Sequence, residues 1–408
     1  MHRRELFRLL PPTWLAFQSS LAQAAAEDET YWRLIAQQFP LEPGLLYFNA
    51  ANVCPSSRLV LDRHQQFLRD FHANPSFQNR DKYAPLQERV RLKAAALLNA
   101  EPDEIAITRN TSEGSNTIAT GLDLAPGDEV IVTDHNHPSN LESWRLRAKR
   151  RGFVVKTVEL PVPAPSAAEL MKSLEAAVTP RTKVIAVTHV TSTVGLRYPA
   201  AEVGKLARAR NIWYHLDGAQ SFGAIAVDLR AIGCDSYSTS MHKWPMGPLE
   251  AGLLFVQREG QARVWPSIVT AGWRDDLKGA RKFEVMGQRD DPRVAAIEAA
   301  LDFLMMIGPA RYEARLMQLT TALKKELGAL PGAKVRTNLD PTLSAGVVKL
   351  DFPERDVAKL YAALWEKHRL ALSLTPNGIS RGLRFSPHVY NTMDDVARAV
   401  AAVKQAIA

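Results

Sequence analysis

From about residue 100 onward, short apolar runs alternate with longer stretches in which apolar residues recur every three or four positions. The short runs predict strands, and a run such as 184–187, apolar throughout, indicates burial on both faces of a sheet. The predicted strands are Glu104–Thr108, Glu129–Thr133, Val154–Leu160, Lys183–His189, Ile212–Leu216, Asp235–Thr239 and Gly252–Val256. The predicted intervening helices include Ser112–Gly121, Leu141–Arg151, Ala167–Ala177 and Ala200–Arg210. This alternation predicts an α/β fold, a mostly parallel sheet wrapped by helices.

The pattern changes after about residue 290. Long helical stretches at Val294–Ile307 and Tyr312–Leu327 lead to strands near Ala345–Leu350 and Gly382–Ser386. Helices at Asp356–Lys367 and Met393–Ile407 flank these strands. We therefore expect a large domain with an N-terminal arm over residues 25–290 and a smaller C-terminal α+β domain over residues 291–408.

Composition adds mainly exclusions. The 408 residues are 46% hydrophobic, enough for both domains, and no apolar run approaches the length of a membrane span. The net charge is +8, and the densest basic cluster lies on one predicted helix, at Arg145, Arg147, Lys149, Arg150 and Arg151. No aromatic residues interleave with this cluster, so we interpret it as a solvated helix face rather than a nucleic-acid site. The two cysteines form no CxxC or CxxH pattern, and zinc is not expected.

The N-terminus resembles an export signal. Arg3 and Arg4 precede Leu6, Phe7 and a modest apolar stretch, and residues 22–24 offer a small-residue cleavage site. Residues 1–24 are therefore a candidate twin-arginine signal, and this route would send the folded protein to the periplasm. The alternative is an amphipathic N-terminal helix of a cytoplasmic protein.

The strongest chemical signal is a carboxylate and a lysine that each follow a predicted strand. Asp217 ends the apolar run 212–216, and Lys243 comes just after the strand Asp235–Thr239. Pyridoxal 5'-phosphate requires this pair: the lysine amine binds the cofactor aldehyde as a Schiff base, and the aspartate keeps the pyridine nitrogen protonated. The ring then accepts electrons from a carbanion.

Hydroxyl-bearing residues near these positions predict a phosphate site. Thr111 and Ser112 open a helix after a strand, where free N–H groups and the helix dipole attract anions. Asn110 and Glu113 have the spacing of a helix N-cap. Capping residues begin most helices, so this signal is weak by itself. We expect Ser240 and His242 to supply further donors.

Two more residues are candidates for contacts with the cofactor ring. Gln220, in the turn that follows Asp217, can hydrogen-bond the phenolic oxygen of the cofactor or its Schiff base with the lysine. His137 follows a strand, and we expect it to stack on the pyridine ring. A metal pair of His135 and His137 is discounted because their side chains diverge on an extended loop and no third ligand is evident.

As a set, the motifs resemble the class V aminotransferase family of fold-type I pyridoxal-phosphate enzymes, and within it the isopenicillin N epimerase-like subgroup. The similarity runs from about Leu46 to the C-terminus. The matching segments are residues 47–51, 109–113, 217–220, 240–243, 384–386 and 390–392.

The resemblance implies roles residue by residue. Lys243 is the Schiff-base lysine, Asp217 the pyridinium partner, and Gln220 and His137 the ring contacts. Thr111, Ser112, Ser240 and His242 match the phosphate ligands, and Arg384 matches the arginine that clasps the substrate α-carboxylate. Family members form homodimers, and Gln288 is a candidate to reach the cofactor phosphate of the neighbouring subunit.

Departures from the cysteine desulfurases within this family led to a negative prediction. A desulfurase carries a reactive cysteine on the loop before the arginine motif, and residues 367–383 contain none. We therefore expect an enzyme other than a desulfurase. Ser192 stands where relatives often have a ring-contacting asparagine, and Glu250 stands where many have glycine.

The predicted reaction is transamination of an amino-acid or peptide-like substrate, with the lysine amine as the base at Cα. Epimerisation, lysis and oxidative decarboxylation remain open, because the sequence identifies the electron sink but not the fate of the carbanion. Exported relatives that act on a glutamyl group of the siderophore pyoverdine make a periplasmic tailoring role a further alternative. A cofactor-free binding protein with the same fold is the alternative from another class.

Overall fold

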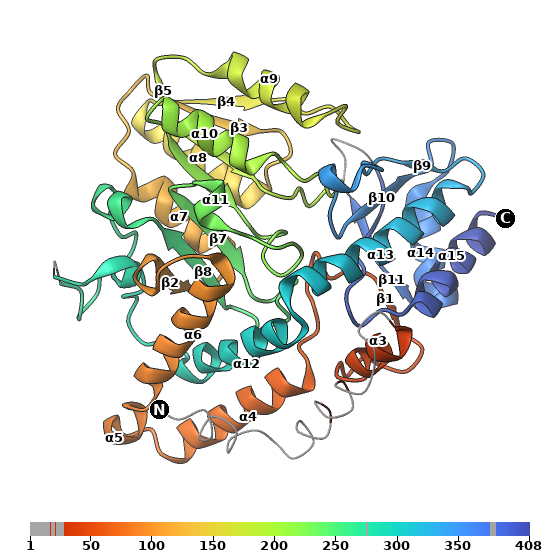
Figure 1. The fold of residues 1–408 in the computed structure, drawn as a ribbon, viewed down its shortest axis with the longest axis horizontal. Coiled ribbons are helices and arrows are strands. Elements are labelled where there is room, and N and C mark those ends of the chain that lie inside the picture. Colours follow the sequence, from red (N-terminus) through yellow and green to blue (C-terminus); the bar gives the residue numbers. More distant parts are fainter. Residues whose placement is uncertain (1–16, 18–20, 22–27, 275, 376–380) are drawn as a thin grey trace.

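The computed structural model describes residues 17, 21, 28–274, 276–375 and 381–408. The chain forms two lobes of unequal size, and helices α12 (Asp291–Ile307) and α13 (Pro309–Gly328) run one after the other from the larger lobe to the smaller (Figure 1). Most of the candidate N-terminal signal, residues 1–24, lies outside the described residues. Its two described residues, Phe17 and Leu21, are buried against the core of the larger lobe.

The larger lobe is built around a seven-stranded sheet in the order β2-β8-β7-β6-β5-β3-β4. Only β8 runs antiparallel to its neighbours, so the prediction of a mostly parallel sheet is confirmed. The strands are β2 (Ile105–Thr108), β3 (Glu129–Thr133), β4 (Val154–Val158), β5 (Thr182–Thr188), β6 (Trp213–Asp217), β7 (Ser236–Ser240) and β8 (Gly252–Val256).

Helices cover both faces of this sheet, as its apolar strands require. Ile131 and Ile185 point to a core shared with α6, α9 and α10, whereas Val130 and Val132 point to a core shared with α7 and α8. Each strand therefore buries alternate residues on opposite faces. The helices are α6 (Tyr83–Leu98), α7 (Thr111–Gly121), α8 (Pro138–Arg151), α9 (Ala167–Ala177), α10 (Ala200–Ala209) and α11 (Leu229–Ile232).

An N-terminal arm and a long helix complete the larger lobe. Helix α12 (Asp291–Ile307) packs against α4 (Arg58–Ala73) and α6. The arm also contains α3 (Glu29–Ala36) and α5 (Phe77–Arg80). Elsewhere in the chain, short 3₁₀ helices occur at η2 (Pro102–Glu104), η3 (Arg258–Arg263), η4 (Gly279–Phe283) and η5 (Pro341–Leu343). The domain boundary predicted at residue 290 precedes α12 and stays a prediction.

The smaller lobe is a four-stranded antiparallel sheet covered by helices, in the order β12-β13-β10-β9. A short parallel pair of β1 with β11 ties the N-terminal arm to this lobe. The strands are β1 (Leu46–Tyr47), β9 (Lys334–Val335), β10 (Val348–Asp351), β11 (Leu370–Ala371), β12 (Ser373–Thr375) and β13 (Gly382–Phe385). The helices are α13 (Pro309–Gly328), α14 (Val357–His368) and α15 (Met393–Ile407). The predicted combination of an α/β lobe with a smaller α+β lobe is confirmed.

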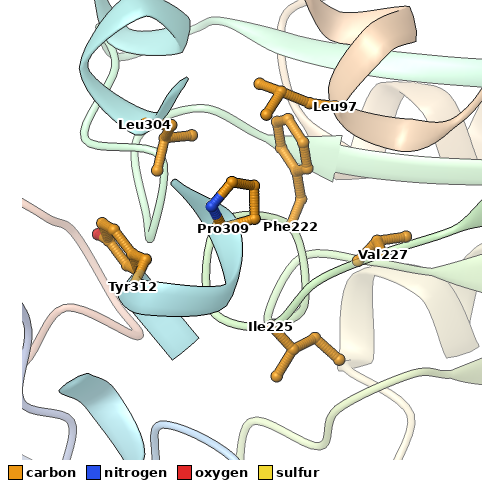
Figure 2. A pocket seen from close by; sticks show the side chains of 8 residues that line it. Leu97, Phe222, Ile225, Val227, Leu304, Pro309 and Tyr312 are labelled. Atoms are coloured by element: carbon orange, nitrogen blue, oxygen red, sulfur yellow. The ribbon is translucent and has the colours of Figure 1, made fainter. Parts of the chain in front are cut away.

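A small apolar pocket lies between α6, the end of α12 and the loop after β6 (Figure 2). It is lined by Leu97, Phe222, Leu304 and other apolar side chains, with Tyr312 as the one polar residue. The Tyr312 hydroxyl donates to the backbone oxygen of Trp244 and is therefore already used. We interpret this pocket as a packing gap behind the loop that carries Lys243. No helix among the described residues is both long and apolar enough to cross a membrane.

Candidate active site

The predicted site residues gather where the parallel strands end. Asp217 is the last residue of β6, Ser240 is the last residue of β7, and the turn Asn110–Thr111 follows β2. Because β2, β6 and β7 run in the same direction, their carboxyl ends lie at one edge of the sheet. Ligands of α/β sheets bind at this edge.

Lys243 lies just beyond β7 and is half-buried. Burial lowers the pKa of its amine from 10.5 to about 8; the nearby charge of Asp217 opposes this shift, and that of Arg384 adds to it. A lysine with such a pKa is partly neutral near physiological pH. It can therefore act as a nucleophile or as a base.

The Asp217 carboxylate is buried and held by two N–H donors. The backbone N–H of Ala219 donates to Oδ1 at 3.0 Å, and the side-chain amide of Asn140 donates to Oδ2 at 3.4 Å. Gly218 lets the chain turn here, because a Cβ at this position would lie 1.9 Å from the Tyr237 ring. Hydrogen bonds from N–H groups favour the ionised carboxylate.

The start of α7 is joined to the end of β7. The backbone N–H and the hydroxyl of Thr111 both contact the Ser240 hydroxyl, at 2.9 and 2.7 Å. Asn110 caps the helix by accepting from the Glu113 N–H at 2.9 Å, as predicted. Gly252 permits this close approach, since a Cβ there would lie 2.7 Å from the Asn110 Cα.

Ser112 and His242 leave donors for an anion at this helix end. The Ser112 N–H is in the first turn of α7, where no carbonyl of the same helix can accept it. The buried Nδ1 of His242 has no hydrogen-bond partner among the described residues. Burial, together with the charge of Lys243, lowers the pKa of His242 to about 4, so the imidazole is neutral and presents one N–H. These donors fit a phosphate group.

His137 is exposed and caps α8, accepting through Nδ1 from the Ser139 N–H at 3.3 Å. Although the side chain is exposed, the protein atoms around it displace part of its hydration; this effect and the charge of Lys243 lower its pKa, whereas the charge of Asp217 raises it. The ring therefore shares one electrostatic environment with both residues, as stacking on a cofactor held between them requires. His135, by contrast, contacts the hydroxyl of Thr193 at 2.9 Å. Among the described residues no group of three metal-binding side chains occurs.

Gln220 is buried and partly committed to its own chain. Its amide oxygen accepts from the Trp244 indole at 2.8 Å, and one N–H donates to the Ala51 carbonyl at 2.9 Å. One amide hydrogen remains for the predicted contact with a phenolic oxygen.

Arg384 extends from β13 of the smaller lobe to the larger one. It donates to the Ser192 carbonyl at 2.9 Å and to the Asn49 side chain at 3.1 Å, while its buried Nε finds no partner among the described residues. Burial lowers its pKa to about 10, which leaves it charged at neutral pH. A buried guanidinium with a free donor edge fits a carboxylate.

Sequence reasoning assigned no role to Asn49 and did not foresee the Ser192 carbonyl as an acceptor. Both lie far from Arg384 along the chain, by 335 and 192 positions. Asn49 belongs to a segment that carried the family resemblance, and this was the only available signal. Asn140 was also missed, because nothing in its local pattern indicates a contact with Asp217.

Gln288 lies against Arg80 of its own chain, whose guanidinium donates to the amide oxygen at 3.0 Å. Nearby, Arg80 also pairs with Asp291 at 3.2 Å. The predicted reach of Gln288 to the phosphate in a neighbouring subunit stays a prediction.

Taken together, these residues fit pyridoxal phosphate. Asp217 suits the pyridine nitrogen, Lys243 the aldehyde, and the α7 start with His242 the phosphate. When bound, the cofactor withdraws electrons from the bond that is broken at Cα of an amino acid.

Comparisons with known proteins agree with this geometry. The model of the family "Aminotransferase class-V" matches residues 46–399. An isopenicillin N epimerase from Amycolatopsis lactamdurans is 30% identical, over 92% of this chain and 98% of its own. A probable cysteine desulfurase from Methanothermobacter thermautotrophicus is 29% identical, over 89% of this chain and 94% of its own. The solved structure of the cysteine desulfurase CsdA from Escherichia coli superposes with a TM-score of 0.81 at 25% identity, covering 93% of this chain and 98% of CsdA.

These matches correct the predicted enzyme class, an aminotransferase that is not a cysteine desulfurase. Desulfurases are among the similar relatives and solved structures, and the relatives named above include no aminotransferase. The missing cysteine is a difference in one loop, whereas the similarity to desulfurases extends over the whole scaffold. The loop alone was therefore not sufficient to exclude the desulfurases. Cys54 and Cys234, the two cysteines of the chain, are both buried.

The family model, the epimerase relative and the site geometry lead to the same assignment. The cofactor is pyridoxal phosphate, and the fold is that of the fold-type I enzymes. The chain belongs to the class V aminotransferase family.

Proposed function

We propose that this enzyme inverts the configuration at Cα of an amino acid or of an amino-acid unit in a peptide. The observation that carries this proposal is the Lys243 amine, whose lowered pKa of about 8 makes it a base next to Asp217 and Arg384. Similarity to an isopenicillin N epimerase over nearly the whole of both chains supports epimerisation as the net reaction.

The residues divide the task between binding and proton transfer. The free donor edge of Arg384 receives the substrate α-carboxylate and fixes Cα relative to Lys243. The neutral amine of Lys243 takes the α-proton from one face of Cα, and solvent water delivers a proton to the opposite face, after which Lys243 releases its proton to solvent. Substrate and product contain the same atoms, so no oxidant or second substrate is required.

A panel of amino acids and short peptides incubated in deuterated water tests this proposal. We expect deuterium at Cα together with the opposite stereoisomer, detected by mass spectrometry and chiral chromatography, and neither product with Lys243→Ala. Formation of an oxo acid without inversion would contradict epimerisation.

Cysteine desulfurisation is the second candidate, because a probable cysteine desulfurase is 29% identical over most of both chains. Its distinguishing product is the sulfur of L-cysteine, released as sulfide in the presence of a thiol reductant. Sulfide release without Cα inversion of any substrate in the panel would replace the first candidate by the second.

We also propose that residues 1–24 direct export to the periplasm, where a glutamyl group of a siderophore such as pyoverdine is a candidate substrate. The support is the Arg3-Arg4 pair with the apolar stretch after it. Cell fractionation tests the address: the double variant Arg3→Lys/Arg4→Lys should keep the enzyme in the cytoplasm. Equal periplasmic amounts of variant and parent would contradict this route.

We further propose that the enzyme is a homodimer. Exposed apolar side chains near the site support this, because such side chains often mark a protein–protein interface. The exposed residues are Leu249, Trp265 and Val269. Along the chain they are close to Glu250, Ser267 and Ile268, which line a pocket together with Ser112. Light scattering of the purified holoenzyme should give twice the chain mass, and a single-chain mass would contradict the proposal.

A further inference from the structure

We propose that Asn140 is a positioning residue that keeps the Asp217 carboxylate ionised, and that Trp144 fixes the Asn140 amide in the orientation this requires. The inference rests on the proposed role of Asp217 as the partner of the cofactor's pyridine nitrogen. It adds two residues of α8 to the machinery of the site.

The three side chains form a buried chain of hydrogen bonds. The Trp144 indole donates to Asn140 Oδ1 at 3.1 Å, and Asn140 Nδ2 donates to Asp217 Oδ2 at 3.4 Å. The exposed fractions of the three residues are 0%, 1% and 2%. The Ser143 hydroxyl also donates to the Asn140 carbonyl at 2.6 Å, which further fixes the first turn of α8.

The indole determines the orientation of the amide. An indole N–H can only donate, so the Asn140 oxygen must face Trp144. The amide nitrogen then faces Asp217. Without the indole donor, the Asp217 carboxylate alone would select the amide N–H, and the Asn140 oxygen would lose the partner that holds it in place.

The orientation decides the protonation state that the site favours. A donated N–H stabilises an ionised carboxylate, whereas a carbonyl oxygen in the same place would favour the protonated acid. The ionised acid in turn keeps the pyridine nitrogen protonated, and a protonated ring is the stronger electron acceptor.

The same helix turn also carries His137, which caps α8. His137, expected on the face of the cofactor ring, and Asn140, which contacts Asp217, thus both lie at the start of α8. Trp144 is buried in the core between α8 and the sheet and anchors that turn.

The test uses holoenzyme loaded with pyridoxal phosphate labelled with nitrogen-15 in the ring. The chemical shift of the ring nitrogen, followed against pH, reports its protonation without any turnover. Trp144→Phe keeps an aromatic ring and removes the N–H donor; we expect the midpoint for loss of the ring proton to fall by about one pH unit, a tenfold change. Asn140→Leu, of similar shape and without a donor, should lower it at least as far.

Two controls make the result specific. Trp213→Phe removes another buried indole N–H, which donates to Ser236 at 3.0 Å, and should leave the midpoint unchanged. Asp217→Asn should lower the midpoint most, because it removes the charge itself. Circular dichroism tests whether each variant is folded. If Asn140→Leu does not fold, Trp144→Phe still tests the inference, because it is the milder substitution.

The outcomes separate the inference from the function on which it rests. Midpoints unchanged in Trp144→Phe and Asn140→Leu, with a lowered midpoint in Asp217→Asn, would overturn the roles of Asn140 and Trp144 alone. A midpoint unchanged in Asp217→Asn would overturn the role of Asp217 in the proposed function, and this inference with it.

Discussion

The cofactor end of the active site is built from turns that directly follow strands β2, β6 and β7, whereas the substrate end depends on one arginine brought from the smaller lobe. Thr111, Asp217 and Lys243 lie within three residues of a strand end. Arg384 is held instead by Asn49 and Ser192, from two distant parts of the chain. Cofactor chemistry is therefore encoded locally, and substrate recognition depends on how the two lobes meet.

The largest effect is expected from a substitution at the cofactor end, at Lys243. Lys243→Ala should lose the visible absorption of the bound cofactor and slow Cα–H exchange by about 10⁴-fold, because it removes both the covalent attachment and the base. Absorption spectroscopy and deuterium exchange measure the two losses. Lys183→Ala, at an exposed lysine of β5, should change neither. A Lys243→Ala enzyme that keeps its visible absorption and its activity would contradict the role of Lys243 at the cofactor end.

The next effect belongs to the substrate end alone. Arg384→Lys keeps the charge and loses the planar fork, so kcat/KM for a substrate with a free α-carboxylate should fall about 100-fold while the cofactor absorption stays. Asn49→Ala, which removes one bond that orients the guanidinium, should cost about tenfold.

A substrate analogue with an amide in place of the α-carboxylate is the matched control for both variants. Parent and variants should process it equally slowly. Loss of cofactor from Arg384→Lys would mean that the two ends are not separable in the way proposed.

The effect of pH on stability is smaller and involves both lobes. Burial lowers the pKa of Lys243 and of Lys349 to about 8, each from an ordinary value of 10.5. Between about pH 8 and 10.5 these two amines bind more protons in the unfolded chain than in the folded one. Their contribution to the free energy of unfolding of the cofactor-free protein should therefore rise with pH across this window, by about 1.4 kcal/mol for each unit by which a pKa is lowered. Buried groups with a raised pKa, such as the thiols of Cys54 and Cys234, contribute in the opposite direction.

Urea unfolding of parent and variants isolates these contributions. Lys349→Met should flatten the rise with and without cofactor. Lys243→Met should flatten it only without cofactor, because the bound cofactor already removes the titrating amine in the parent. Identical slopes in parent and Lys349→Met would show that Lys349 titrates normally.

Much of the cofactor end was predictable because its signals are short. A strand can be read from an apolar run, and the predicted strands Glu129–Thr133 and Gly252–Val256 match β3 and β8. The end of such a strand is also where ligands bind, so Asp217 and Ser240 could be placed at one edge before their contacts were known.

The substrate end could not be predicted to the same depth, because its contacts depend on tertiary structure. Arg384 was found through resemblance, but neither Asn49 nor Ser192 signals in sequence that it will meet a guanidinium. The exclusion of desulfurases failed for a related reason. It treated one loop as decisive for the enzyme class, although the scaffold shared with desulfurases extends over 93% of the chain.

The smallest expected effect concerns backbone strain at the cofactor end. Glu250, between Lys243 and β8, has a φ of 49°, a conformation that favours glycine. Glu250→Gly should raise the free energy of unfolding by about 0.5 kcal/mol, because the ion pair lost with Arg293 is exposed and weak. Arg369→Gly, in the smaller lobe with a φ of 52°, should gain less, since Arg369 also stacks on Trp365.

Urea midpoints of the two variants measure this difference. Destabilisation by Glu250→Gly would show that the Arg293 pair outweighs the strain.

The most direct measurement is the identity of the lysine that carries the cofactor. The holoenzyme is treated with borohydride, which makes the bond between cofactor and lysine permanent, and its peptides are analysed by mass spectrometry. We predict the modified cofactor on Lys243. The assignment of the site would be contradicted by label on another lysine or by no label at all. Lys349 is the lysine to examine first, because its pKa is lowered to about 8 as well.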